Sequence, residues 1–192
     1  MNMDKLPKKL QNHPFSWTDA KSAGITQYAL KQLLNTGKLE RLAHGVFRTT
    51  EEVDLSPEDQ YKSALLRAGK PSAVCLISAL AYYHLTDVIP KKTWVLVNAN
   101  KITNQQDIRL WRRRSPKWNL GMKTVDGLKI TTVERTLLEC LHYKDLAGGA
   151  ALALNAIRLA LEEKKTTMSN LLKMAEKLGL KKKILSYLEV LL

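Results

Sequence analysis

Apolar and polar positions separate cleanly between residues 26 and 36 when this segment is placed on a helix at about 100° per residue. One arc holds only apolar side chains, which are Ala29, Leu30, Leu33 and Leu34. The opposite arc holds amides, a cation and a phenol but no acid, and its members are Gln27, Tyr28, Lys31, Gln32 and Asn35. Thr26 is a suitable N-cap and Gly37 a suitable C-terminal stop. The pattern predicts a helix with one face in a core.

The segments on either side of this helix predict a winged helix-turn-helix. A shorter helix is expected over residues 18–23, and Gly24 then supplies a tight turn with helix-turn-helix spacing. Downstream, residues 39–42 and 46–48 are two short strand candidates around Ala43-His44-Gly45. This hairpin is the expected wing.

The polar arc and the wing carry the residue types that contact DNA. Amide, hydroxyl and cationic side chains hydrogen-bond to base edges and phosphates. The side chains expected to read the major groove are Thr26, Gln27, Tyr28, Lys31 and Gln32. Those expected to hold phosphate or reach the minor groove are Lys38, Arg41, His44 and Arg48. The alternative is an ordinary amphipathic helix with a solvated face.

The remainder of the chain predicts a second domain with a small sheet and a helical C-terminus. Ser56-Pro57-Glu58-Asp59 is a strong helix start, because a serine cap, a proline and two acids follow one another. Residues 72–84 are apolar on nearly every side and predict a buried helix. The expected strands are 94–98, 108–114, 120–125 and 128–131, and Asp126-Gly127 predicts a two-residue hairpin turn between the last two. The expected C-terminal helices are 133–142, 150–163, 168–178 and 184–192.

These elements place the protein in the α+β class. We expect an N-terminal winged helix-turn-helix over residues 1–50, opened by a helix at 2–12 that Pro7 shortens or bends. A polar, acidic linker is expected at 49–57. The second domain, residues 51–192, is expected to hold a small, mainly antiparallel sheet of three or four strands.

Charge strengthens the interpretation as a nucleic-acid binder. The formal net charge is +13 and the pI is about 9.8, which favours a polyanionic partner. The excess recurs between residues 101 and 150, and a second basic patch stands there beside Trp111 and Trp118. Its residues are Arg109, Arg112, Arg113, Arg114 and Lys117. Nucleic-acid or partner binding and a charged edge strand that resists aggregation both explain it.

Catalytic and cofactor signals are weak. Asp107, Asp126, Glu134 and Glu139 are scattered rather than gathered as a metal-dependent enzyme needs, and Gly148-Gly149 lacks the Lys-Ser/Thr of a phosphate-binding loop. Cys140 and His142 have no second pair with metal-ligand spacing. We therefore expect no enzymatic activity, no cofactor and no metal.

Cysteine usage and hydropathy point to a cytoplasmic protein with no membrane partner. Cys75 and Cys140 lie in apolar patterns that suit reduced, buried thiols. The N-terminus has no apolar segment of secretory type, and no apolar run approaches the length of a membrane span.

Several motifs resemble the AbiEi antitoxin family. Residues 15–48 are similar to its winged helix, with the shared positions Phe15, Gly24-Ile25-Thr26, Leu30, Leu33, Gly37, Leu39, Arg41 and Gly45-Val46-Phe47. Ile77-Ser78-Ala79-Leu80 and His84-Leu85-Thr86-Asp87 with Pro90 are similar to the family's SAL…GLT…P pattern. Gly127–Leu137 is similar to its G…VT…ERTL segment. The resemblance covers about residues 15–145.

The resemblance implies a type IV toxin–antitoxin antitoxin that serves phage defence by abortive infection. Such proteins repress their own operon by binding inverted repeats in double-stranded operator DNA. They counter a nucleotidyltransferase-like toxin without forming a stable complex with it. The alternative is a protein-interaction module, in which the winged helix is a scaffold and the second domain binds a toxin or another protein directly.

Overall fold

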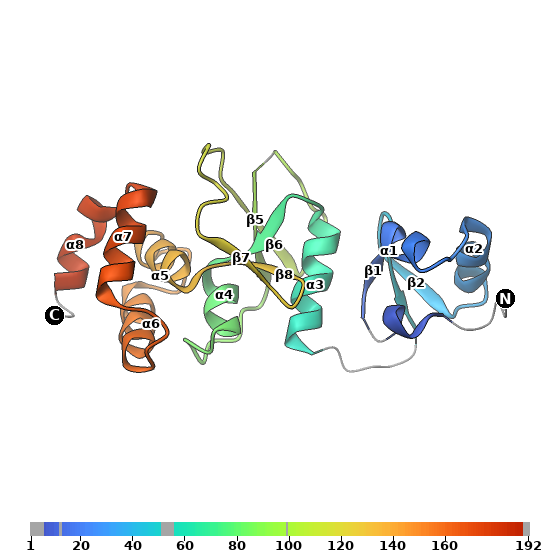
Figure 1. The fold of residues 1–192 in the computed structure, drawn as a ribbon, viewed down its shortest axis with the longest axis horizontal. Helices are drawn as coiled ribbons and strands as arrows, with labels where there is room; N and C mark the ends of the chain where they lie inside the picture. Colours follow the sequence, from blue (N-terminus) through green and yellow to red (C-terminus); the bar gives the residue numbers. More distant parts are fainter. Residues whose placement is uncertain (1–5, 12, 51–55, 99, 190–192) are drawn as a thin grey trace. The chain divides into compact units, whose positions relative to one another are not determined.

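The protein divides into two compact units in a computed structural model that describes residues 6–11, 13–50, 56–98 and 100–189 (Figure 1). The units are residues 1–70 and 71–192. The boundary therefore lies beyond the expected position at 50/51, because the helix Pro57–Ala68 groups with the first unit. Most of the expected linker, residues 51–55, lies outside the described residues.

The first unit has the connectivity of a winged helix-turn-helix. Its elements are a 3-10 helix at Lys8–Leu10, β1 (Phe15–Ser16), α1 (Trp17–Ser22), α2 (Gln27–Asn35), β2 (Leu39–Ala43), β3 (Val46–Thr49) and α3 (Pro57–Ala68). The three strands form an antiparallel sheet in the order β1-β3-β2, and α3 packs against β1. Of the helix expected at 2–12, the described part contains only the 3-10 turn that follows Pro7.

Local sequence explains where the two helices of the motif begin. The Ser16 hydroxyl accepts from the Asp19 N–H, and the Asp19 carboxylate accepts from the Ser16 N–H, which forms a capping box. Thr26 accepts from the Ala29 N–H at 3.1 Å and caps α2 as expected. The apolar arc of α2 enters a core that includes Phe15 and Phe47. These caps and this core fix the polar face of α2 outward.

The second unit contains a five-stranded mixed sheet. Its strands are β4 (Ser72–Val74), β5 (Thr93–Val97), β6 (Ile108–Arg112), β7 (Met122–Val125) and β8 (Leu128–Thr131), in the order β6-β5-β4-β8-β7. The β4–β5 and β7–β8 pairs are antiparallel, whereas β4–β8 and β5–β6 are parallel. The α+β class is confirmed, but the expectation of a mainly antiparallel sheet with three or four strands was wrong.

The missing strand is β4, which was expected to be the first turn of a helix over 72–84. Residues 72–74 are buried on both faces at the centre of the sheet, and α4 covers only Leu76–Tyr82. A continuous apolar run suits a central strand and a buried helix equally, so its periodicity does not distinguish them. Leu76 adopts a φ of +48°, and this left-handed residue separates the strand from the helix.

The C-terminal helices follow the expected pattern and pack in layers. Their bounds are α5 (Val133–His142), α6 (Ala150–Glu162), α7 (Met168–Leu178) and α8 (Lys181–Glu189). Helix α4 lies against β5 and β8, α5 packs on α4, and α6, α7 and α8 each contact α5. Figure 1 shows α5 to α8 gathered at one end of this unit. Residues 190–192, the end of the expected last helix, lie outside the described part.

The β7–β8 turn provides a first test of the fold. Asp126 and Gly127 have φ values of +46° and +79°, as a two-residue hairpin turn requires. We expect Gly127→Ala to lower the free energy of unfolding by about 1 kcal/mol, because a Cβ disfavours positive φ although open space surrounds the position. Gly127→Asn should cost less, since asparagine tolerates this conformation. Urea denaturation checks both, and equal losses would show that backbone strain is not the cause.

Candidate nucleic-acid interface

The polar face of α2 is exposed along its whole length. Gln27, Tyr28, Lys31 and Gln32 are all exposed, and Tyr28 keeps 62% of its surface open to solvent. Leu30 and Leu33 on the opposite side are buried. An aromatic ring this exposed does not contribute to the core, so its hydroxyl and ring edge are available to a partner. No acidic residue occurs between Gly24 and Lys38, and the face therefore suits an anionic surface.

The wing places two of the expected contacts side by side. Strands β2 and β3 are joined through His44 and Gly45, and Gly45 has a φ of +70°. The Arg41 guanidinium donates to His44 Nδ1 at 3.1 Å and from Nε to the Ala43 carbonyl at 3.3 Å. Both side chains are exposed. With Nδ1 accepting from the guanidinium, Nε2 is the ring position that can donate to another partner.

Lys38 lies between α2 and the wing. Gly37, at a φ of +69°, ends the helix, and the Lys38 N–H then donates to the Leu33 carbonyl at 3.0 Å. The Lys38 side chain is exposed. A cation at this junction stands where the chain passes from the expected reading helix to the wing.

Arg48 differs from the other expected contacts because its guanidinium is held within the wing. Arg48 and Glu40 face each other across the β2–β3 pair, and both Nε and Nη2 donate to the same Glu40 carboxylate oxygen. The two side chains are about one third and two fifths exposed. Glu40 neutralises this cation, so Arg48 fits a role in wing structure better than the phosphate contact expected from its sequence position.

The second basic patch is distributed over two faces of the edge strand β6. On one face, the Arg109 guanidinium stacks over the Trp94 ring at 4.4 Å, and Arg113 lies over Tyr143 at 5.4 Å and donates to its hydroxyl. On the other face, Arg112 donates from Nε to the Lys101 carbonyl at 2.8 Å, and Arg114 donates to Asn100 Oδ1. Lys117 is exposed in the loop that follows. The five cations therefore do not form one flat surface.

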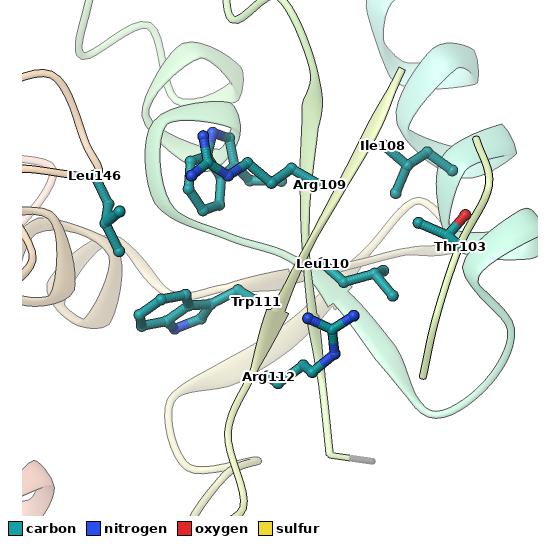
Figure 2. Close-up of a pocket in the computed structure, with 8 residues that line it drawn as sticks. Thr103, Ile108, Arg109, Leu110, Trp111, Arg112 and Leu146 are labelled. Carbon is teal, nitrogen blue, oxygen red and sulfur yellow. The ribbon is translucent and has the colours of Figure 1, made fainter. Parts of the chain in front are cut away.

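A groove of about 470 Å³ follows β6, and all five residues of the strand line it (Figure 2). Consecutive residues of a strand point to opposite faces, so only a groove along the strand edge meets all of them. Trp94 and Leu146 line it beside Arg109 and Trp111, whereas Thr103 lines it beside Leu110 and Arg112. Figure 2 shows Leu146, Arg109 and Trp111 on one side of the strand and Thr103, Leu110 and Arg112 on the other. Sequence reasoning found the cations but not Trp94, Tyr143 or Leu146, which join them only through the fold.

The most deeply buried charged side chains of the second unit form an ion pair that the sequence did not predict. Arg135 and Glu139, each 1% exposed, form an ion pair at 3.1 Å along α5. Arg135 also donates to the carbonyls of Trp118 and Leu120. A buried guanidinium thus holds the segment between β6 and β7 onto α5. Within the described chain, Arg135 Nε and Glu139 Oε2 have no hydrogen-bond partner.

Several polar residues in and next to α4 and α5 also have structural roles. The Ser78 hydroxyl accepts from the Trp94 N–H at 2.9 Å and so links α4 to β5. Glu134 accepts from the Thr166 hydroxyl at 2.8 Å, and the Thr131 and Thr136 hydroxyls are 2.7 Å apart. These contacts explain why such residue types occur at these positions in this chain.

The two cysteines are free, buried thiols. Burial raises the pKa of Cys75 well above its ordinary value, and the Glu139 carboxylate raises it further. Burial and Glu139 raise the pKa of Cys140 in the same way. Both thiols therefore stay protonated near neutral pH, a state that disfavours nucleophilic chemistry.

Two other kinds of site are absent from the part of the chain that the structure describes. Among residues 6–11, 13–50, 56–98 and 100–189, no three His, Cys, Asp or Glu side chains come together as metal ligands. Within the same ranges, no helix has the length and apolar character needed to cross a bilayer.

Comparison with known proteins gives a fold relationship. No protein-family model matches the chain, and a search of curated proteins gives no match. Among solved structures, the crystal structure of the RV2827C protein from Mycobacterium tuberculosis matches with a TM-score of 0.52 and 15% sequence identity. The match covers 85% of this chain and 66% of that chain, slightly under two thirds of its length. The two proteins therefore share an α+β fold over most of this chain.

Proposed function

We propose that this protein is a DNA-binding transcriptional regulator that uses α2 as its recognition helix. The supporting observation is the exposed face of Gln27, Tyr28, Lys31 and Gln32 on a helix whose other face is locked into the core of a winged helix-turn-helix. In this fold the second helix of the motif enters the major groove, where such side chains reach base edges. Thr26 caps the end that would lead into the groove.

Two cations and a histidine extend the proposed contact to the DNA backbone. Lys38, Arg41 and His44 are exposed, and the Arg41 guanidinium is held against His44 at the wing. Cations at such positions set register and orientation on the duplex rather than sequence preference. Because each neutralised phosphate releases counterions, binding should weaken steeply as salt is added.

We further propose that the regulator is an antitoxin of the AbiE-like, type IV kind, acting on its own promoter and against a nucleotidyltransferase-like toxin. This step rests on the resemblance of residues 15–145 to the AbiEi family. Inverted repeats in the promoter are the expected operator, since two copies of the winged helix would then contact equivalent half-sites. The same proposal holds that the protein acts in the cytoplasm and counters the toxin without forming a stable complex with it.

The promoter part of the proposal is tested by fluorescence anisotropy with the DNA upstream of the protein's own gene. We expect binding that is much tighter than to a shuffled duplex of equal length and that falls as salt rises. Equal affinity for both duplexes would contradict sequence-specific regulation.

The antitoxin part is tested separately, by co-expression with a nucleotidyltransferase-like protein encoded beside the gene. Restored growth without co-purification supports it, whereas a stable complex with no DNA binding favours the protein-interaction alternative.

Arg41 and Arg48 give an internal comparison within the wing. We expect Arg41→Gln to weaken DNA binding and to reduce the slope of log K against log salt by about 0.9, the value for one lost phosphate contact. Arg48→Gln should leave the slope unchanged, because Glu40 already holds that guanidinium. Anisotropy titrations at several salt concentrations measure both. A larger change in slope for Arg48→Gln than for Arg41→Gln would reverse the roles assigned to them.

A further inference from the structure

The backbone groups along the outer edge of β6 point away from the rest of the sheet. The Asp107 carbonyl accepts from Thr93 and the Arg113 N–H donates to Val97, so odd-numbered residues direct their backbone groups toward β5. Alternation along a strand then turns the N–H and C=O of Leu110 and Arg112 outward. Among the residues that the structure describes, no strand pairs with this side of β6. Leu110 and Arg112 both line the groove of Figure 2.

Cations surround this edge and restrict what can pair with it. The cations on β6 and in the segments that flank it along the chain are Lys101, Arg109, Arg112, Arg113, Arg114 and Lys117, whereas the acids next to lining residues in the sequence are Asp107 and Asp145. Pairing with the β6 edge of a second copy would bring two such sets together, which like-charge repulsion disfavours. A strand that carries acidic side chains is instead attracted by these cations. The same charges that discourage self-association therefore select an anionic partner.

The aromatic contacts favour a peptide over a single-stranded nucleic acid. Arg109 covers the Trp94 ring and Arg113 lies over Tyr143, so these faces are occupied where a base would need to stack. Guanidiniums held against rings are pre-organised, and they keep N–H groups for carboxylates. Trp111 and the 38%-exposed Leu146 add an apolar surface for an alternating side chain.

We propose that the β6 groove is a docking site for an extended acidic segment of a partner protein, which adds as a sixth strand beside β6. The backbone groups of Leu110 and Arg112 supply the ladder. The surrounding arginines hold carboxylates, and the surface of Trp111 and Leu146 takes an apolar side chain. This site lies wholly in the second unit and is independent of the proposed DNA binding by α2.

The test uses the full chain and a fluorescent peptide of about eight residues, a common strand length, that alternates Glu and Val. We expect saturable binding that is at least about tenfold tighter than that of the matching Lys–Val peptide. The double variant R109Q/R112Q should weaken binding about tenfold or more. The charge-matched control K173Q/K177Q, on exposed positions of α7, should bind as the wild type does.

Two further probes separate strand addition from simple charge attraction. Peptides N-methylated at every Val or at every Glu each lose one edge of hydrogen-bond donors, so at least one of them should bind about tenfold more weakly than the parent. The proposal is overturned if both methylated peptides bind as the parent does. It is also overturned if oligothymidylate of equal length displaces the Glu–Val peptide, binds more tightly than it does, and loses that affinity in R109Q/R112Q, which would assign the groove to nucleic acid. Neither result bears on α2.

Discussion

Replacing Gln27, Tyr28, Lys31 and Gln32 together by alanine is expected to weaken binding to the promoter duplex by at least about a hundredfold. Each good base contact contributes about 1–3 kcal/mol of discrimination, so the loss of several exceeds two factors of ten even when they are not additive. Binding to shuffled DNA should fall much less, because one cation is lost and the wing remains. The comparison of the two duplexes therefore isolates sequence reading.

The fold of this quadruple variant should be intact. All four side chains are exposed, and alanine favours a helix at each position. A matched control on α7 replaces Asn170, Lys173, Glu176 and Lys177 by alanine, which also lowers the net charge by one and touches only exposed positions. Gel-shift and anisotropy measurements on both variants give the answer. Promoter binding by the α2 variant at wild-type strength would reject α2 as the recognition helix.

Breaking the buried Arg135–Glu139 pair is expected to be the most destabilising single change in the second unit. In Arg135→Met the Glu139 carboxylate remains buried without its cation, and the carbonyls of Trp118 and Leu120 lose their donor. Removing one partner of such a pair costs about 3–5 kcal/mol. Urea unfolding followed by tryptophan fluorescence reports mainly on this unit, because three of the four tryptophans, Trp94, Trp111 and Trp118, lie in it.

A double-mutant cycle separates the ion pair from other effects of the substitution. Arg135→Met combined with Glu139→Leu should recover at least half of the lost stability, since an apolar replacement of both partners leaves no unpaired charge. Glu163→Gln, at a partly exposed pair with Lys165, should cost less than about 1 kcal/mol. If the double variant is no more stable than Arg135→Met, the loss comes from the freed carbonyls rather than from the stranded carboxylate.

The α2 prediction could be made from the sequence alone, whereas the Arg135–Glu139 prediction needed the tertiary structure. The α2 face follows from the sequence, because helical periodicity, a cap and a terminal glycine act within a few residues of one another. The winged helix, the Asp126-Gly127 turn and the C-terminal helices were predictable for the same reason. The Arg135–Glu139 pair is at helical spacing, yet only tertiary packing shows that it is buried and that it anchors residues 118–120.

Tertiary structure alone decided the sheet and the environment of the second patch. Ser72–Val74 is a strand because β5 and β8 pair with it from distant parts of the chain, and no local pattern encodes those partners. Arg48 appeared free in sequence but faces Glu40 across a hairpin register. Trp94, Tyr143 and Leu146 reach the β6 arginines only through packing.

The sequence by itself determined which segments form helices, turns and a basic reading face, since these depend on neighbouring residues. Strand order, burial of charge and the β6 groove depend on contacts between distant residues, and those exist only once the chain has folded.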